Sequence, residues 1–173
     1  MANSYNSITE RAFRIANMAG TEPNGSPLID SAVLTEDLFR QALREAVVSE
    51  RFERTFSLTL TNGKVALPDG IIRSELSSAA ITSGDDIGVP TSYEEQFYDF
   101  RRAPHVQLNY AAISGNELHF REAGEDAGEF DGALNITTVA LPDIPSSASD
   151  AISMPETLAE LTAAILAKMM RGV

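Results

Sequence analysis

The spacing of apolar residues changes near Phe52, and this change constrains the fold more than any other feature of the sequence. Before it, apolar residues recur every three or four positions and predict two helices, from about Ile8 to Met18 and from about Asp30 or Thr35 to Phe52. After it, apolar and polar residues alternate, which predicts a half-buried strand with Phe56, Leu58 and Leu60 on one face. Helices followed by strands indicate an α+β chain rather than a parallel α/β sheet.

Two turn motifs divide the strand region. Asn62-Gly63 is a strong hairpin signal, because both residues tolerate the positive φ of a type I′ turn, and it leads into a return strand from Lys64 to Leu67. Ser114-Gly115-Asn116 joins a second predicted hairpin, made of the strands Val106 to Ile113 and Glu117 to Arg121. The region is therefore expected to form antiparallel strands.

Further elements are predicted around these hairpins. Ile71 to Thr82 is expected to be extended, and Ala133 to Val139 to form a last strand. Ser92 and Glu95 have the spacing of a capping box. They predict a short helix that carries Phe97, Tyr98 and Phe100.

The chain is predicted to end in a helix that reaches about Met170. Ser153 would cap it, with Glu156 as its partner and Pro155 in the first turn. Residues 1–52 and 154–173 then form a helical part, and residues 53–153 form an antiparallel β part. We expect one compact α+β unit in which the terminal helices make a small bundle packed against an antiparallel sheet or sandwich.

Composition excludes several classes of protein. Thirteen Lys and Arg against 25 Asp and Glu give a net charge of -12, which argues against a basic nucleic-acid reader. The absence of cysteine excludes disulfides and thiolate chemistry. The sequence also predicts no signal peptide and no membrane span, because charges interrupt every apolar run.

Two clusters invite a metal or catalytic interpretation and do not sustain it. His105 and His119 lie in the second hairpin, but no pattern of Asp or Glu beside them completes a metal triad. The segment Glu122 to Gly132 is acidic, but its spacing does not match a calcium-binding loop. Phosphate-loop, dinucleotide, serine-elbow and HExxH motifs are absent. We therefore expect no catalytic residue, metal or cofactor.

The last helix points beyond a monomer, since it is apolar over about 200° of its circumference. Either a second subunit or the chain's own helices and sheet could cover this arc. Its candidate interface residues are Leu158, Leu161, Ile165, Leu166, Met169 and Met170. Arg40, Arg44 and Arg51 share the outer face of the second helix, where they could hold an acidic partner or form a solvated face with Glu36 to Arg40 pairing.

The order of motifs resembles that of a known family. Gly63 to Gly70 reads GKVALPDG, Leu108 to Phe120 reads LNYAAISGNELHF, and Met154-Pro155-Glu156 opens the late helix. A strand ending in Leu-Pro, a Tyr strand followed by Gly-Asn and Leu, and an apolar helix opened by Met-Pro-Glu resemble the head-to-tail adaptor, or connector, proteins of tailed bacteriophages. The similarity covers roughly Phe52 to Met170, and departs from the commoner pattern in the acidic loop and the lack of tryptophan.

The resemblance implies a structural role in the virion neck after assembly in the host cytoplasm. It implies a ring, typically of twelve copies, that docks on the portal protein, meets tail or stopper proteins and lets DNA pass through its lumen without specific binding. Candidates for the lumen or the tail-facing surface are the acidic residues of the loop, Glu122, Glu125, Asp126, Glu129 and Asp131.

Three other interpretations remain open at this point. A tail-completion or tail-terminator protein of the same particle would also form a ring, with a larger sheet and fewer helices. A small hydrolase would need the histidines and the acidic loop to converge. A soluble ligand-binding module would use exposed aromatic residues such as Tyr93, Tyr98 and Tyr110.

Overall fold

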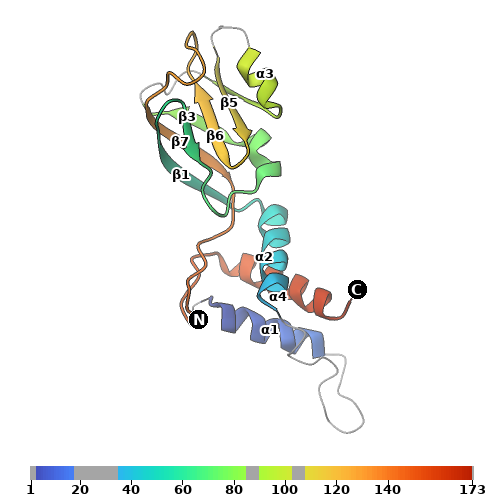
Figure 1. Ribbon diagram of the computed structural model, residues 1–173. Coiled ribbons are helices and arrows are strands. Elements are labelled where there is room, and N and C mark those ends of the chain that lie inside the picture. Colours follow the sequence, from blue (N-terminus) through green and yellow to red (C-terminus); the bar gives the residue numbers. More distant parts are fainter. Residues whose placement is uncertain (1–2, 18–34, 85–89, 103–107, 173) are drawn as a thin grey trace. The chain divides into compact units, whose positions relative to one another are not determined.

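The computed structural model describes residues 3–17, 35–84, 90–102 and 108–172, which divide into two compact units (Figure 1). The helical unit comprises Met1–Phe52 and Leu141–Val173, and the strand unit comprises Glu53–Ala140. Helices and strands together confirm the α+β class. The Gly- and Pro-containing stretch from Gly20 to Pro27, which the sequence predicts to be a loop, lies outside the described residues.

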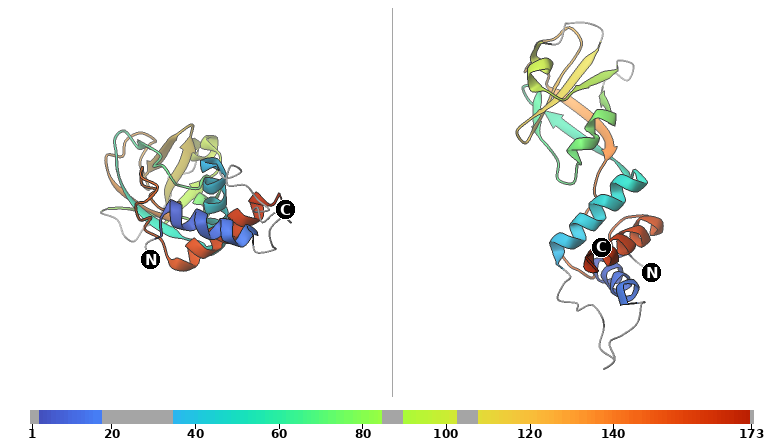
Figure 2. Two further views of the ribbon diagram at one scale, coloured as in Figure 1. Left: turned by 90° about the horizontal axis from the view of Figure 1, so that it is seen from below. Right: turned by 90° about the vertical axis from the view of Figure 1, so that its right-hand side faces the viewer.

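Three helices form the helical unit: α1 (Tyr5–Asn17), α2 (Glu36–Glu50) and α4 (Glu156–Met170). Helix α4 packs against both of the others, so the predicted bundle of terminal helices is present (Figure 2). The apolar faces meet as the helical periodicity predicts. Their buried residues include Ile8, Ala12, Phe39, Leu43, Val47, Leu158, Ala163 and Leu166.

The helix starts test the predicted caps. Thr35 caps α2, because its Oγ1 accepts a hydrogen bond from the Leu38 amide at 3.1 Å. The spacing of Ser7 and Glu10 also predicts a capping box at the start of the first helix. That prediction was wrong, because α1 begins earlier: the Ser7 amide donates to Ser4 Oγ at 3.2 Å, and the Ser4 amide donates to Ser7 Oγ at 2.9 Å. The Ser153 cap was also wrong, since Pro155 is the N-cap of α4 and no side chain caps the helix.

The irregular segment before α4 runs beside the start of α1. The Ile152 amide donates to the Asn3 carbonyl at 2.6 Å, and the Asn6 amide donates to the Ala148 carbonyl at 3.1 Å. Ile152 is buried. This segment, which the sequence grouped with the strands, therefore completes the helical unit.

The strand unit contains two sheets. The first has the order β1-β7-β3 and is antiparallel; its strands are β1 (Glu53–Leu60), β7 (Gly132–Val139) and β3 (Ala80–Ser83). The second has the order β2-β6-β5-β4; its strands are β2 (Lys64–Ala66), β6 (Glu117–Arg121), β5 (Asn109–Ser114) and β4 (Thr91–Glu94). Strand β4 pairs parallel to β5, so the second sheet is mixed rather than antiparallel throughout.

The two sheets share one apolar core. Leu60, Ile81 and Leu134 contribute from the first sheet, and Leu118 and Phe120 from the second. Because each strand alternates its side chains, one face of each sheet meets the other, and the result is a small sandwich.

The two predicted turns form, but only the second joins two strands that pair with each other along their length. Asn62 and Gly63 have φ values of 52° and 67°, as a type I′ turn requires. The strands on either side then pair in different sheets, β1 with β7 and β2 with β6, so this turn carries the chain from one sheet to the other. The second hairpin is confirmed, with Ser114 opposite Glu117 and Gly115 and Asn116 at its tip.

Two segments differ from the prediction. Arg73–Ser78 forms a 3₁₀ helix (η2) within the stretch that was expected to be extended. Ser92 lies in strand β4 instead of capping a helix, and its hydroxyl donates to Glu94 Oε1 at 3.0 Å. Helix α3 (Phe97–Arg102) follows, and Phe100 packs on Tyr110 and Ala112 of β5 in a second, smaller core.

Candidate assembly surfaces

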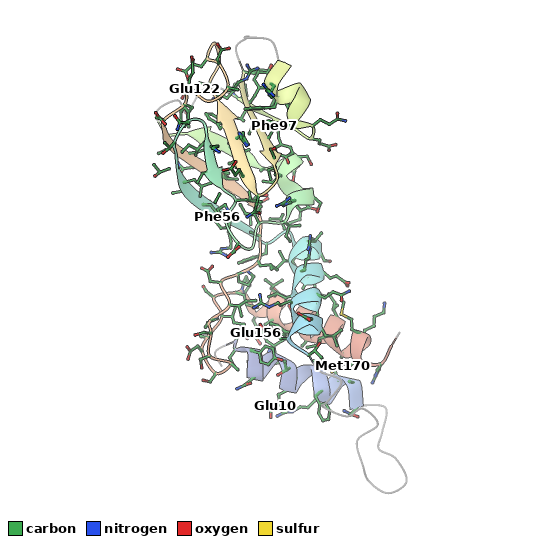
Figure 3. The ribbon with its side chains drawn as sticks, viewed as in Figure 1. Glu10, Phe56, Phe97, Glu122, Glu156 and Met170 are labelled. Carbon is green, nitrogen blue, oxygen red and sulfur yellow. The ribbon has the colours of Figure 1, made fainter. Side chains whose placement is uncertain are left out.

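The acidic loop between β6 and β7 is built from two tight turns. The Glu125 amide donates to the Glu122 carbonyl at 3.2 Å, and the Glu129 amide donates to the Asp126 carbonyl at 3.3 Å. The Glu129 carboxylate in turn accepts a hydrogen bond from the Asp126 amide at 3.2 Å. These bonds give the loop a defined backbone (Figure 3, where Glu122 marks its start).

The far end of this loop is fixed to the Asn62-Gly63 turn. The Gly63 amide donates to the Phe130 carbonyl at 2.7 Å, and the Asn62 amide donates to the Asp131 carboxylate at 2.7 Å. The Phe130 ring is buried against Phe120, with 4.8 Å between ring centroids. One of the predicted acidic residues, Asp131, is thus part of the scaffold of the loop.

Three other carboxylates of the loop border a polar hollow of about 290 Å³, whose lining includes Ser83, Glu122, Glu125 and Glu129. Glu129 and Asp126 are exposed, whereas Glu122 and Glu125 are half-buried. Within the described ranges, no group of three or more His, Cys, Asp or Glu side chains is placed to hold a metal ion. The loop thus presents exposed negative charge at Asp126 and Glu129.

The predicted histidine pair cannot be evaluated as a pair, because His105 lies outside the described residues. His119 packs against Phe97 of α3, with 4.6 Å between ring centroids. Burial lowers the pKa of His119 below its usual 6.5; Glu117, whose Oε2 is 3.8 Å from Nε2, opposes this shift, and Lys64 adds to it. His119 thus belongs to an aromatic cluster on the outer face of the second sheet.

Arg121 is a buried side chain that the sequence did not single out. Its guanidinium lies 4.9 Å from the centroid of the Tyr110 ring and 5.8 Å from that of Phe100. Such cation–π contacts compensate part of the cost of removing the charge from water. Tyr110 is consequently buried and is not an exposed platform for a ligand.

The candidate interface residues of α4 fall into two groups. Leu158, Leu166 and Met170 are buried inside the helical unit, so the chain itself covers them. Leu161, Ile165 and Met169 are half-buried and recur at every fourth position, which places them on one edge of the helix. We call these three residues the α4 stripe; it is the part of the predicted interface that reaches the surface.

The three arginines of the second predicted helix have different environments. Arg40 pairs with Glu36 at 2.7 Å, as the solvated-face interpretation anticipated. Arg44 is exposed on the same helix. Arg51 is the C-cap of α2, with a left-handed φ of 50°, and its amide donates to the Val47 and Val48 carbonyls. Arg40 and Arg44 thus lie on the exposed side of α2, while Arg51 terminates the helix.

Helix α1 is held at its middle and at its C-terminal end by the C-terminal part of the chain. Arg11, in the middle of α1, forms an ion pair with Glu156 at the start of α4, and the hydrogen bond from Arg11 lowers the pKa of the Glu156 carboxyl. At the C-terminal end, Arg171 donates to the carbonyls of Ile15 and Ala16, both at 2.8 Å. The last carbonyls of a helix have no amide partner within that helix, so Arg171 satisfies two groups that α1 itself leaves open.

Comparison with known proteins now decides the family. The chain matches the family of the SU10 adaptor protein over residues 4–172, which include both units. It belongs to the SU10 adaptor protein family. No curated protein matches the chain.

Membership of the SU10 adaptor family confirms the resemblance to phage head-to-tail adaptors. The protein is accordingly a phage adaptor, a structural component of the virion that associates with other virion proteins. In the described part of this SU10 adaptor, no helix has the length and apolar character that crossing a bilayer requires.

The sequence alone did not predict two long-range contacts that shape these surfaces of the SU10 adaptor. Arg171 reaches across 155 positions to α1, and Gly63 contacts a loop far along the chain. Only Gly63 gave a local signal, through the Asn-Gly dipeptide. The other contact depends on tertiary structure and has no short-range pattern.

Proposed function

We propose that this SU10 adaptor is one subunit of a closed ring, of about twelve copies by analogy with the phage connectors it resembles. The ring joins the portal to the tail and continues the DNA channel. The observation that carries the proposal is the family match over residues 4–172. The proposed role is mechanical and electrostatic and includes no bond-making step.

The α4 stripe supports a contact with another virion protein. A row of half-buried apolar side chains on one edge of a helix gains stability when a partner removes it from water, by roughly 25 cal/mol per Å². We assign Leu161, Ile165 and Met169 to the portal side, and the arginines of the helical unit, Arg40, Arg44 and Arg51, to its contacts with the portal or with a neighbouring copy.

The acidic loop supports the channel role. Three of its carboxylates, Glu122, Glu125 and Glu129, border the polar hollow, and Asp126 lies in one of the two turns of the loop. The whole chain carries a charge of -12. Carboxylates that face a passing duplex repel its phosphates, so DNA slides without adhering. We propose that this loop faces the lumen or the tail.

The decisive experiment mixes the purified protein with portal rings of the same phage and examines the product by native mass spectrometry and electron microscopy. We expect a stoichiometric complex with cyclic symmetry. The double variant Leu161→Asp, Ile165→Asp should abolish it, whereas Ala164→Asp, at an exposed position of the same helix, should not. A complex with tail tubes instead of portals would reject the adaptor role in favour of tail completion.

A further inference from the structure

The outer side of α2 carries a row of exposed residues that is independent of the α4 stripe. This row, which we call the ridge, consists of Gln41, Arg44, Glu45 and Val48, and the same side chains border an open depression of about 460 Å³. Val48 is 37% exposed and is the one large hydrophobic residue in the exposed class among those the structure describes. The ridge thus presents an apolar side chain flanked by charges.

The positive and negative charges of the ridge lie on opposite sides of it. At about 100° per residue, Gln41 and Val48 lie within roughly 20° of one line along the helix. Arg44 is displaced about 40° from Val48 to one side, and Glu45 about 60° to the other. One flank of the ridge is therefore positive and the other negative.

A groove in the same unit has the matching order of charges. It lies between α1 and α4, which pack side by side in both views of Figure 2, and has a volume of about 500 Å³. Arg14 stands on the α1 wall and Glu160 on the α4 wall, both exposed, while Ile15 and Ala163 provide an apolar floor. The Arg11–Glu156 ion pair crosses the groove toward one end.

We propose that the groove of one copy receives the ridge of a second copy. Val48 packs on Ile15, which is the half-buried apolar residue of the groove. Arg44 then faces Glu160 of the neighbour, and Glu45 faces Arg14. In the reversed orientation Arg44 would meet Arg14, and like charges in contact disfavour an interface. The charge order therefore selects one direction of docking.

This inference rests on the proposed ring, for which it names the contact between copies. The interface is heterologous, because the ridge of each subunit meets the groove of the next and both surfaces remain available at the ends of an open chain. Such contacts close into a ring when the rotation allows it. The α4 stripe is then left for a different protein, in agreement with its assignment to the portal.

Charge exchange tests the pairing on the full chain with portal rings. Arg44→Glu alone and Glu160→Arg alone should each lower ring assembly about tenfold or more, because each places like charges in contact. The double variant should restore assembly to near the level of the unmodified protein. Lys168→Glu changes an exposed α4 charge outside the groove by the same amount and should have no effect.

Cysteine cross-linking tests the geometry, and the chain contains no cysteine of its own. When Val48→Cys and Ile15→Cys proteins are mixed on portal rings and oxidised, a covalent dimer with one copy of each should form, since a disulfide needs Cα atoms within about 7 Å. Thr59→Cys, exposed on β1, should give no dimer with Ile15→Cys.

The outcomes separate this inference from the proposed function. Suppose that rings form with unchanged yield in Arg44→Glu, and that oxidation does not link the Ile15→Cys and Val48→Cys proteins. That result would overturn the ridge-and-groove contact and leave the ring intact. Folded protein that gives neither rings nor a portal complex would reject both. Rescue by the double charge variant together with the specific covalent dimer would establish the contact.

Discussion

The two units treat their partly buried apolar side chains differently. In the strand unit these residues lie at the rim of the sandwich core, or are covered by a cation, as Arg54 covers Phe56 at 5.1 Å (Figure 3). In the helical unit three of them form a row on one helix, the α4 stripe, and Val48 is exposed by itself on α2. Rows of apolar surface are typical of protein contacts, whereas isolated apolar residues are ordinary. We therefore propose that assembly depends on the helical unit, while the strand unit supports the loops.

The largest effect should come from the core of the strand unit. Phe120 is fully buried and stacks edge-on against Phe130, so Phe120→Ala should lower the free energy of unfolding by about 3–5 kcal/mol. Urea unfolding, followed separately for helix and strand signals, measures this change. Thr59→Ala, at an exposed position of β1, should change it by less than about 0.5 kcal/mol. A loss below about 1 kcal/mol in Phe120→Ala would contradict the self-contained core.

The next effect concerns the turn that supports the acidic loop. A Cβ on Gly63 would lie 3.0 Å from both the Gly128 amide nitrogen and the Phe120 carbonyl oxygen, at a φ of +67°. Gly63→Ala should therefore destabilise the strand unit by about 2–4 kcal/mol. Gly115 has a similar φ of +62° but open space around its Cβ, so Gly115→Ala should cost only about 1 kcal/mol. Equal losses in the two variants would show that φ alone decides.

A smaller effect is expected on the stability of the strand unit, which should depend on pH through His119. Burial holds the pKa of His119 below 6.5, so the folded state binds this proton less readily than the unfolded state does. The stability contribution is complete above pH 6.5 and is lost as the pH falls through the lowered pKa. The strand unit of the unmodified protein should thus weaken in mild acid, and His119→Gln should reduce this dependence in urea titrations at several pH values.

The smallest expected effect is the loss of stability in the helical unit when the carboxylate of the Arg11–Glu156 ion pair is protonated at low pH. The hydrogen bond from Arg11 holds the pKa of Glu156 below 4.5, so its contribution is present above pH 4.5 and is lost as the pH falls through the lowered value. An NMR titration of the Glu156 carboxyl should give a lower pKa in the unmodified protein than in Arg11→Lys or Arg11→Ala. An unchanged pKa in Arg11→Ala would remove this ion pair from the account of how α1 is held.

The sequence predicted elements better than it predicted their partners. The Asn62-Gly63 turn was identified because tight turns depend on a few neighbouring residues. The partners of the strands beside that turn were not, since β1 pairs with β7 about 80 residues away and β4 pairs parallel to β5. A Ser and a Glu three positions apart also occur in strands, as Ser92 demonstrates.

The sequence predicted the residues of the candidate surfaces, but not which of them are exposed. The apolar arc of the last helix was evident from its periodicity, but the sequence could not separate the buried Leu158 and Leu166 from the half-buried Ile165. That division depends on where α1 and α2 pack. The matching charges of the ridge and the groove likewise become visible only when α1 and α4 lie together.

The pairing of β1 with β7 has a consequence for how the protein can vary. Glu53 is the register partner of Val139, so the strand unit begins and ends at adjacent points. A module whose two ends are neighbours can be replaced or enlarged while the chain on either side keeps its course. Replacement or enlargement of the strand unit would therefore leave the course of the three helices unchanged.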